Sequence, residues 1–380
     1  MDTLQQRIQA HIETMCLEFG SRHCGAVGEQ RTADYIEKYF AELGLEVISE
    51  KFPARGWDFE SFELYNVTVG RAVPGATACY FSGPIDIEDT PLILKEAQIQ
   101  QLKRQPVKDR LCFVIAESMF MDHNKVAEQL EVLGAGAVIF ISKSSDSAPN
   151  TKTVCSPLIS RIGTAAVNLT GAYDIMGHAG DIYRMRIQAR SFDTYSRNII
   201  ARIGGGKAKG VIGAHYDAAP LIQGANDNAS GTAMFLELAR LLRNRKLPMT
   251  LEFVAFSAEE YLQENNPVGS KAYLDRYGQE DIRWYFNCDS SCDYFGKTVL
   301  GIGLGETLPK LESKYPTEVR TGGGDNKTFC QAGIPSVWLR TNQCFDLLHT
   351  AQDTIDKLDY DLIAKKCSDM YDLVLQLSKA

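Results

Sequence analysis

The sequence has no run of about 18 apolar residues that would suit a transmembrane helix. Residues 1–8 contain no basic segment followed by an apolar core, which is the pattern of a secretory signal peptide. Internal repeats and low-complexity segments are missing as well. We therefore expect neither secretion nor a membrane partner.

Closely spaced cysteine pairs are also missing, although the chain has 10 cysteines. Without a CxxC pair or the spacing of a disulfide framework, neither a cysteine zinc site nor a set of disulfides is indicated. Reduced thiols and a cytoplasmic location are the simplest expectation. Cys288 and Cys292 flank Asp289, and we interpret both as small buried side chains, which is the usual state of free cysteine.

Positive charge is scarce, because 40 lysines and arginines stand against 48 aspartates and glutamates, which gives a formal net charge of -8. No Lys/Arg-rich run offsets this balance, so nucleic acid is not an expected partner. The length of 380 residues and the hydrophobic content of 44% exceed what a single core normally serves. The prediction is therefore two domains.

What the sequence does contain is a strand that ends in a candidate metal ligand. Residues 210–214 are apolar and glycine-rich, as in a buried parallel strand, and His215 stands at the carboxyl end. Asp227 lies just ahead of a predicted helix over 230–246, for which Ser230 is the N-cap candidate. Since an isolated histidine at a strand end is more often structural than metal-binding, this stretch needs support from elsewhere.

Two further predicted strands provide that support. The run 251–256 leads into Glu259 and Glu260, and the next predicted strand ends at Asp289. Because the carboxyl ends of parallel strands meet at one edge of a sheet, we expect these side chains to share a crevice with His215. Farther along the chain, His349 adds a second imidazole and completes a set of five candidate ligands.

Five short motifs carry a resemblance to a known family. In chain order they read G-A-H-Y-D, G-A-N-D-N-A-S-G, F-S-A-E-E, N-C-D and L-H-T-A-Q-D-T. They resemble the co-catalytic zinc peptidase family that contains bacterial leucyl aminopeptidases and glutamate carboxypeptidase. The resemblance covers the beginning of the chain and everything from about Ser196 onward. It implies an α/β fold with a mixed, mostly parallel central sheet flanked by helices.

The resemblance implies a site with two zinc ions per chain. One ion takes His215 and Asp289, the other takes Glu260 and His349, and Asp227 bridges them. Imidazole and carboxylate suit zinc, and three protein ligands per ion leave a position open for water. Two ions that share a carboxylate lie roughly 3.5 to 4 Å apart and activate a water molecule between them.

Two carboxylates beside these ligands have separate expected roles. Glu259 is the candidate general base that moves the proton; alternatively, two glutamates in a first helical turn merely complement the helix dipole. Asp217, two residues after His215, is the candidate that orients the imidazole. Its alternative is simply the start of a loop.

The segment from 58 to 192 differs in character, with short strands and turns and no candidate metal cluster. A strand over 110–115, a helix over 124–133 ended by Gly134 and a strand over 137–141 resemble the protease-associated domain that several family members carry as an insertion. The polar loop 143–153 is a candidate flap. We expect His123 and His178 on the surface.

The flanking parts of the chain are predicted to form the catalytic domain. The expected division is 1–57 for its first part, 58–192 for the inserted α/β lobe and 193–380 for its second part. Predicted helices cover Leu4 to Met15, 28–43 and 360–377, and predicted strands cover 45–50 and 198–203. The connection that contains residues 20–22 also resembles the start of the family.

Two departures from the family pattern concern the substrate pocket. Asn326 stands where many members have histidine, and Leu348 stands where some members have a tyrosine that can hydrogen-bond the developing oxyanion. Neither position is a ligand. An arginine cluster that includes Arg340 would favour binding of a substrate α-carboxylate, whereas an arginine after a strand is usually just solvated.

The expected function is a zinc-dependent exopeptidase acting on short peptides, with an aminopeptidase as the first choice. The alternatives are a carboxypeptidase or dipeptidase of the same family, a glutaminyl-cyclase-like acyltransferase with a single zinc, and a non-catalytic receptor-like binding protein. The oligomeric state is not indicated by the sequence.

Overall fold

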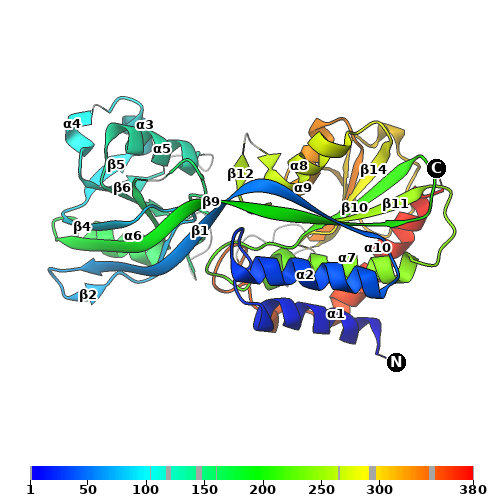
Figure 1. Ribbon diagram of the computed structural model, residues 1–380. Helices are drawn as coiled ribbons and strands as arrows, with labels where there is room; N and C mark the ends of the chain where they lie inside the picture. The colour runs from blue at the N-terminus through cyan, green and yellow to red at the C-terminus, as the bar shows by residue number, and fades with distance from the viewer. Residues whose placement is uncertain are drawn as a thin grey trace.

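A computed structural model describes residues 2–102, 104–116, 121–142, 148–159, 161–263, 266–290, 297–341 and 347–379. Two main sheets, one of ten strands and one of five, organise the described chain. Figure 1 shows them as two bodies joined by a pair of long strands, β1 (Val47–Asn66) and β9 (Tyr183–Ile203). The predicted mixed α/β fold with a second, smaller sheet is confirmed.

The larger sheet has a parallel centre and antiparallel flanks. Its strand order is β16-β15-β17-β14-β10-β11-β9-β1-β2, with β4 paired to β9. The other strands of this sheet are β2 (Arg71–Ala72), β4 (Ile85–Asp89), β10 (Lys209–His215), β11 (Thr250–Phe256), β14 (Ile282–Asn287), β15 (Thr298–Gly303), β16 (Thr317–Val319) and β17 (Ser336–Thr341). Strands β11, β10, β14 and β17 run parallel, so their carboxyl ends lie at one edge of the sheet.

Helices cover both faces of this sheet (Figure 1). Their bounds are α1 (Leu4–Glu13), α2 (Val27–Glu42), α7 (Gly231–Leu242), α8 (Val268–Tyr277), α9 (Gly324–Gln331) and α10 (Tyr360–Leu377). Phe40 on α2, Phe235 on α7 and Phe253 on β11 stack in series between the helices and the sheet, each fully buried. The predicted helix over 360–377 matches α10. No described helix has the length and apolar character that crossing a bilayer requires.

The smaller sheet has the order β3-β8-β7-β6-β5. Its elements span β3 (Ala76–Ala78), β5 (Leu92–Lys95), β6 (Leu111–Ile115), β7 (Ala137–Ile141), β8 (Gly163–Val167), α3 (Glu96–Ile99), α4 (Arg104–Val107), α5 (His123–Leu133) and α6 (Leu169–Gly177). The predicted strand–helix–strand unit is β6, α5 and β7. Gly134 ends α5 in the left-handed conformation, at φ 83°, where glycine meets no steric penalty.

His123 is buried, which corrects the expectation that it lies on the surface. It is only 3% exposed, and its ring packs against Phe140 with the centroids 5.3 Å apart. Its Nδ1 lies 3.0 Å from the carbonyl oxygen of Met121. His123 is the first residue of α5, and a helix start gives no sequence signal of which side chain turns toward the sheet. His178 is partly exposed and contacts Asp181.

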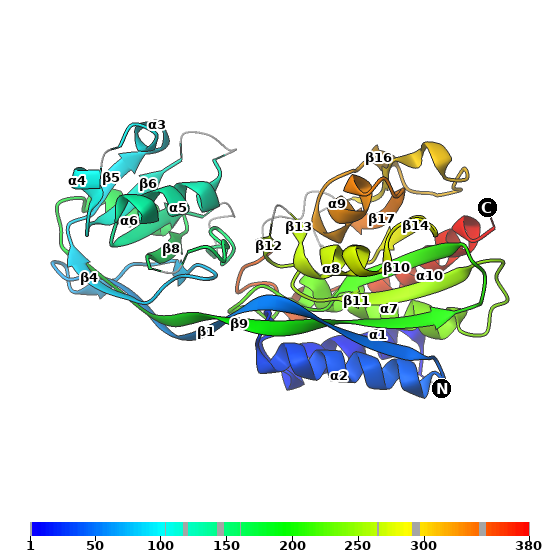
Figure 2. The same ribbon diagram turned by 45° about the horizontal axis from the view of Figure 1, so that its top comes forward.

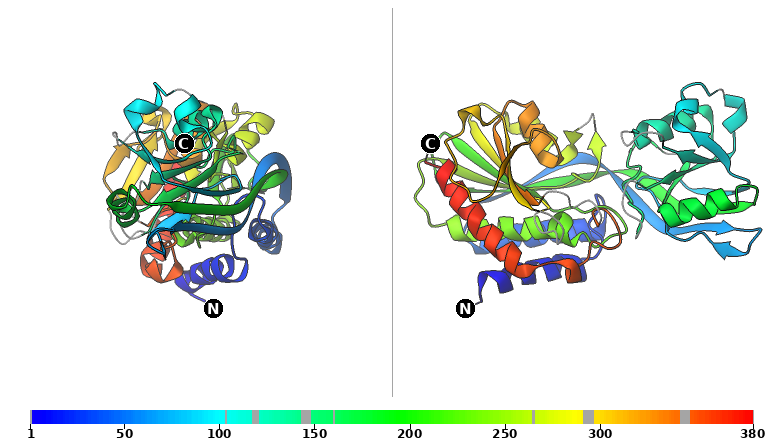
Figure 3. Two further views of the ribbon diagram at one scale, coloured as in Figure 1. Left: turned by 90° about the vertical axis from the view of Figure 1, so that its left-hand side faces the viewer. Right: turned by 180° about the vertical axis from the view of Figure 1, so that it is seen from behind.

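The two long strands that join the bodies were predicted only in part. Strand β1 continues through Pro53 and Gly56 to Asn66, well beyond the predicted 45–50. Proline is tolerated because β1 pairs with β9 along one side and with β2 only at its far end, so Pro53 lies on an edge. The expected boundaries at 57/58 and 192/193 fall within this continuous ladder. Figures 2 and 3 show that both strands run uninterrupted from one body to the other.

Candidate metal centre

The predicted ligands gather at the carboxyl ends of the central parallel strands. His215 is the last residue of β10 and is 1% exposed. Asp289 lies two residues beyond β14, while Glu259 and Glu260 follow β11 after Ala258, which adopts a positive φ of 56°. The edge-of-sheet placement expected from the strand pattern is therefore what the fold produces.

Asp227 lies between the two histidines. Its Oδ1 is 3.1 Å from Nε2 of His215, and its Oδ2 is 2.9 Å from Nε2 of His349. Asp289 Oδ1 lies 3.5 Å from Nε2 of His215, and Glu260 Oε2 lies 3.4 Å from Nε2 of His349. Two groups, His215 with Asp227 and Asp289, and His349 with Asp227 and Glu260, each have their donor atoms within 4.8 Å of one another. One carboxylate is thus shared by two three-residue groups.

The turn Ala225–Ser230 places Asp227. Its backbone is not helical at Asp227 and Asn228, and the peptide bond between these two residues is cis. The carboxylate of Asp353 accepts from the backbone N–H groups of Asn226, at 2.7 Å, and Asp227, at 3.1 Å. Asn228 donates from its side chain to the carbonyl oxygen of His215 at 3.0 Å. These contacts tie the turn to the end of β10 and to the loop that follows His349.

Ser230 does not cap helix α7, contrary to the prediction. Its backbone is helical, and its hydroxyl donates to the carbonyl oxygen of Asn226 at 2.8 Å. The helical backbone begins after Asn228, whose φ and ψ are not helical and whose Oδ1 accepts from the backbone N–H of Gly231 at 3.1 Å, so the cap is Asn228, two residues before Ser230.

Asp217 connects His215 to the paired glutamates. Its Oδ1 lies 3.5 Å from Nδ1 of His215, and its backbone oxygen is closer, at 3.2 Å. Its two carboxylate oxygens accept from the backbone N–H groups of Glu259 and Glu260, each at 3.2 Å. Beyond the predicted contact with the imidazole, Asp217 therefore fixes the turn after β11, a function that its spacing in the sequence does not indicate.

The adjacent glutamates have different surroundings. Oε1 of Glu260 accepts from the backbone N–H of Ala219 at 2.9 Å, and the residue is fully buried. Glu259 is partly exposed and lines the cleft above the centre. Burial, reinforced by the charge of Glu260, raises the pKa of Glu259 well above its usual range, against the opposing charges of His215 and Lys152. Glu259 also forms a third donor group with His215 and Glu260, so the different roles of the pair require a direct test.

The smaller body reaches this centre through residues 150–152, a contact that the sequence did not signal. The ammonium group of Lys152 contacts Oε2 of Glu260. The backbone N–H of Thr151 donates to the carbonyl oxygen of His349 at 2.9 Å, and His349 adopts a positive φ of 58°. Of the predicted flap, residues 143–147 lie outside the described part of the chain. The described remainder of the flap, 148–153, contacts the candidate ligands Glu260 and His349 directly, in addition to bordering the entrance to the site.

Arg22 is another buried contributor that was not singled out for a role. It is 1% exposed, and its guanidinium donates to the carbonyl oxygens of Gly224 at 2.8 Å, Gln223 at 3.0 Å and Tyr216 at 3.3 Å. These acceptors belong to the loop between His215 and Asp227. The sequence signal that could have identified Arg22 was the resemblance of the connection that contains residues 20–22 to the start of the family.

The wall beside Asp289 is formed by glycine and by buried polar residues of α9. Gly324 has a φ of 55°, and a Cβ there would lie 3.0 Å from Oδ2 of Asp289 and 3.4 Å from Oε1 of Glu259. Burial raises the pKa of the next residue, Asp325, to about 7. Asn326, the departure from the family pattern, turns away and donates to the carbonyl oxygen of Arg320 at 3.0 Å.

A cavity of about 290 Å³ opens above the candidate ligands. Leu348, the second departure, lies in its lining. Other residues that line it include Lys152, Tyr261, Arg320, Trp338 and Arg340. Cys288 lies beneath the site and is fully buried, as predicted, whereas Cys292 lies outside the described residues.

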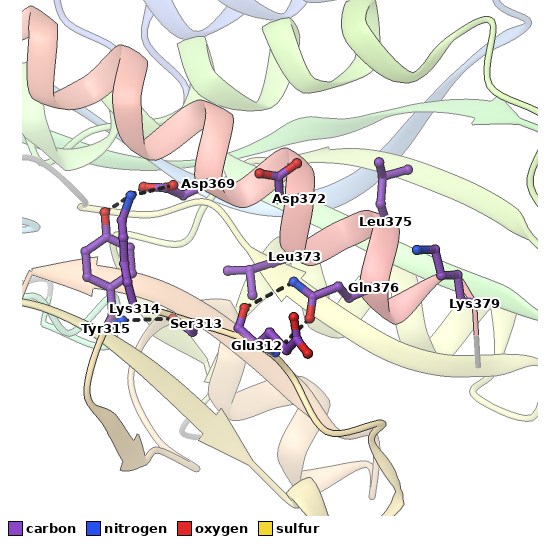
Figure 4. A pocket seen from close by; sticks show the side chains of 10 residues that line it. All are labelled: Glu312, Ser313, Lys314, Tyr315, Asp369, Asp372, Leu373, Leu375, Gln376 and Lys379. Atoms are coloured by element: carbon purple, nitrogen blue, oxygen red, sulfur yellow. Dashed lines mark hydrogen bonds and ion pairs between the residues drawn. The ribbon is translucent and has the colours of Figure 1, made fainter.

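A separate hollow of about 420 Å³ lies between α10 and residues 312–315 (Figure 4). Several of its polar groups pair with one another. Asp369 accepts from Tyr315 at 2.6 Å and from Lys314 at 2.8 Å, and Gln376 exchanges hydrogen bonds with the backbone of Glu312. Because these groups satisfy one another and include no imidazole or thiol, we assign the chemistry to the cavity at the strand ends.

The charge balance at the strand ends fits divalent cations. Six carboxylates gather around the imidazoles of His215 and His349. The carboxylates belong to Asp217, Asp227, Glu259, Glu260, Asp289 and Asp325. Lys152 supplies one positive charge to this group. Buried carboxylates in such number need cations or protons, and the mixture of imidazole and carboxylate donors suits zinc.

Comparison with known proteins shows which family the chain resembles. A model described as Peptidase family M28 matches residues 198–374. Aminopeptidase YwaD of Bacillus subtilis is 27% identical over 375 residues, which cover 91% of this chain and 79% of that protein. Probable lipoprotein aminopeptidase LpqL of Mycobacterium tuberculosis is 27% identical over 282 residues, which cover 71% of this chain and 55% of that protein.

Solved structures show the same fold. The Peptidase M28 precursor of Shewanella amazonensis aligns with a TM-score of 0.79 at 18% identity, covering 99% of this chain and 96% of that chain. The aminopeptidase from Aneurinibacillus sp. strain AM-1 aligns with a TM-score of 0.74 at 21% identity, covering 98% and 94%. The family match spans the strands and loops that assemble the candidate ligands, and over this part the chain resembles peptidase family M28.

Proposed function

We propose that this protein is a zinc-dependent aminopeptidase that removes N-terminal residues from short peptides and holds two zinc ions. The observation that carries the proposal is the position of Asp227, with one carboxylate oxygen beside each imidazole. The relatives described above are named as aminopeptidases. A solved structure of the same fold is described as a zinc aminopeptidase from Bacillus subtilis.

The proposed ligand sets follow the two donor groups. His215 and Asp289 would hold one ion, His349 and Glu260 the other, and Asp227 would bind both. When bound, the pair of ions lowers the pKa of a water molecule and polarises the scissile carbonyl. Asp217 fixes the position of the His215 imidazole relative to the turn that carries Glu259 and Glu260, through one contact with the imidazole and two with backbone N–H groups of the turn.

Glu259 is the proposed proton carrier. Its carboxylate accepts a proton from the attacking water and returns it to the nitrogen of the leaving amine, so that the C–N bond breaks and an acid and an amine form. Its place on the cavity wall, next to a ligand but open to the cleft, supports this role.

The experiment that tests the proposal compares substrates with free and blocked amino termini. Zinc-loaded protein is assayed with aminoacyl arylamides that carry a free α-amine and with N-acylated dipeptides. We expect hydrolysis of the first class and little of the second. Preferential release of the C-terminal residue from N-acylated dipeptides would instead identify a carboxypeptidase, and cyclisation of N-terminal glutamine without hydrolysis would identify an acyltransferase.

A further inference from the structure

Two arginines share the wall of the cavity above the metal centre. Arg340 lies near the end of β17, and Arg320 follows β16, where its backbone N–H donates to the carbonyl oxygen of Ile302 at 2.8 Å. Both guanidinium groups face the indole of Trp338, with their carbon atoms 4.9 Å (Arg340) and 5.5 Å (Arg320) from the ring centroid. Strands β15, β16 and β17 thus bring two cations to one aromatic ring.

The two positive charges are only partly offset. Arg340 donates from Nη1 to Oε1 of Glu318 at 2.9 Å, and that carboxylate is about one-third exposed. Arg320 has no ion pair with any residue that the structure describes. The Nε atoms of both arginines are buried and make no hydrogen bond within the described chain. Burial and the neighbouring charge of Arg340 lower the pKa of Arg320.

The arginine pair lies next to the reacting centre. A Cβ on Gly323 would be 2.6 Å from Nη2 of Arg320, while a Cβ on the adjacent Gly324 would be 3.0 Å from Oδ2 of Asp289. The indole N–H of Trp338 donates to the backbone oxygen of Asp289 at 2.7 Å. Both arginines line the same cavity as the candidate ligands, so a substrate group near the scissile bond enters the space that the guanidinium groups border.

We propose that Arg320 and Arg340 form a carboxylate-binding subsite and that the enzyme prefers substrates that place a carboxylate there. The proposal rests on the proposed peptidase function and adds a substrate class to it. A planar guanidinium donates two parallel hydrogen bonds to a carboxylate, and such a partner would supply acceptors for the buried N–H groups. The carboxylate comes either from the C-terminus of a short peptide or from an aspartate or glutamate side chain.

Metal loading strengthens the argument. The carboxylate of Asp289 partly compensates the charge of Arg320. As a proposed ligand, Asp289 would give its charge to a divalent cation, and the arginine pair would then attract a substrate anion more strongly. A purely structural arginine–tryptophan stack would not discriminate between charged and neutral forms of the same substrate.

The test uses matched substrates that differ only in a carboxylate. Ala-Ala is compared with Ala-Ala-amide to probe the terminal carboxylate, and glutamyl with glutaminyl p-nitroanilide to probe the side chain. We expect the zinc-loaded full chain to prefer the carboxylate member of one pair by about tenfold or more in kcat/KM. Which pair responds identifies the source. Equal rates within both pairs would overturn the proposal.

Variants assign the preference to the arginines. Arg320→Gln and Arg340→Gln should each lower kcat/KM for the carboxylate substrate of the responding pair. The kcat/KM of the neutral substrate should change little, so the two rates become nearly equal. Arg283→Gln, an exposed position on β14, is the matched control and should keep the preference. Arg320→Met and Arg340→Met, which remove the charge but keep a long side chain, serve if a Gln variant fails to fold. A preference that persists in all the folded variants contradicts the assignment.

Binding measurements separate this proposal from the proposed function. Calorimetric titration of zinc-loaded Glu259→Gln with each substrate pair measures the preference without turnover. Tighter binding of the carboxylate member, lost in the arginine variants, supports the subsite even if no substrate with a free amine is cleaved. If the neutral substrates are cleaved but both members of each pair bind equally, the proposed peptidase function is supported and the carboxylate subsite is contradicted.

Discussion

At the scale of single residues, identical side chains next to each other in the sequence meet different surroundings. Glu259 and Glu260 are chemically equivalent, but Glu260 is fixed by the N–H of Ala219 and Glu259 faces the cleft. The carboxylate of Asp217 accepts from the N–H groups of both, which sets the direction in which each side chain leaves the turn. The division between ligand and proton carrier follows from this turn.

The two glutamates should respond differently to removal of their charge. Glu259→Gln is expected to keep both zinc ions and to lose kcat by at least about 10²-fold, with KM little changed, because only proton transfer is removed. Glu260→Gln should weaken one metal site, and high zinc should partly restore its activity. Metal analysis and kcat at saturating zinc compare them. Loss of a zinc in Glu259→Gln, with both retained in Glu260→Gln, would reverse the roles.

Gly324 is expected to be intolerant of a methyl group. Gly324→Ala would place Cβ 3.0 Å from Oδ2 of Asp289 and strain a backbone at positive φ, so we expect weaker zinc binding. Gly333→Ala is a matched control, because Gly333 also has a positive φ, 77°, but open space around its Cβ position. Both variants should lose about 1 kcal/mol of stability. If Gly333→Ala loses zinc equally, strain rather than crowding is responsible.

At the scale of elements, buried polar contacts join segments that hydrophobic spacing treats separately. Glu237 on α7 contacts Arg7 on α1 at 3.0 Å and accepts from Tyr39 on α2 at 2.7 Å and from Arg240 at 2.7 Å. Burial alone would raise its pKa, but the hydrogen bonds from His11, Tyr39 and Arg240 lower the pKa of Glu237 to about 2. The helices behind the metal site are thus joined by one ionised carboxylate.

This carboxylate should make stability depend on pH. Because the folded pKa of Glu237, about 2, lies below its ordinary value of 4.5, ionisation stabilises the fold above pH 4.5 and this contribution is lost as the pH falls toward 2. Glu237→Gln should therefore lower the free energy of unfolding by about 3 kcal/mol near neutral pH and by progressively less below pH 4.5. Urea unfolding across pH 6 to 3 measures this difference. Glu42→Gln, at an exposed position, should show no such trend.

Lys152 occupies a position that a cation at the second site would share. Its ammonium group contacts Oε2 of Glu260, the oxygen that faces His349. Lys152→Met should remove this competition and tighten zinc binding at that site, as measured by titration against a competing chelator. Lys125→Met, exposed on α5 of the same body, is the control. Weaker zinc binding in Lys152→Met would show that the lysine instead holds Glu260 in place.

At the scale of the whole molecule, the two bodies share more than a pair of strands. Strands β1 and β9 run through both, and Thr151 of the smaller body donates to the carbonyl oxygen of His349 in the larger one (Figure 1). Trp57, Tyr80 and Tyr261 belong to one buried cluster that draws residues from both bodies. The metal centre is therefore supported from two sides.

The purified protein should bind two zinc ions per chain. Metal analysis after dialysis against zinc-containing buffer should approach two, and removal by a chelator should lower the midpoint of thermal unfolding, because zinc binds the folded state preferentially. His215→Ala and His349→Ala should each strip one site, since each imidazole belongs to a different donor group. A stable content of one zinc with full activity would contradict the dinuclear proposal.

The sequence alone predicted the five candidate ligands, and it placed His215, Glu260 and Asp289 at one edge of the sheet. Apolar runs that end at His215, Glu260 and Asp289 specify strands and their polar ends locally, and parallel strands then bring those ends together. The tertiary structure alone decided which distant groups support them. Thr151 contacts His349, Asp353 holds Asp227, and Arg320 and Arg340 both pack on Trp338, although long stretches of chain separate most of these partners. Hydrophobic periodicity specifies only neighbours within an element, whereas these contacts depend on how the sheets and loops pack in space.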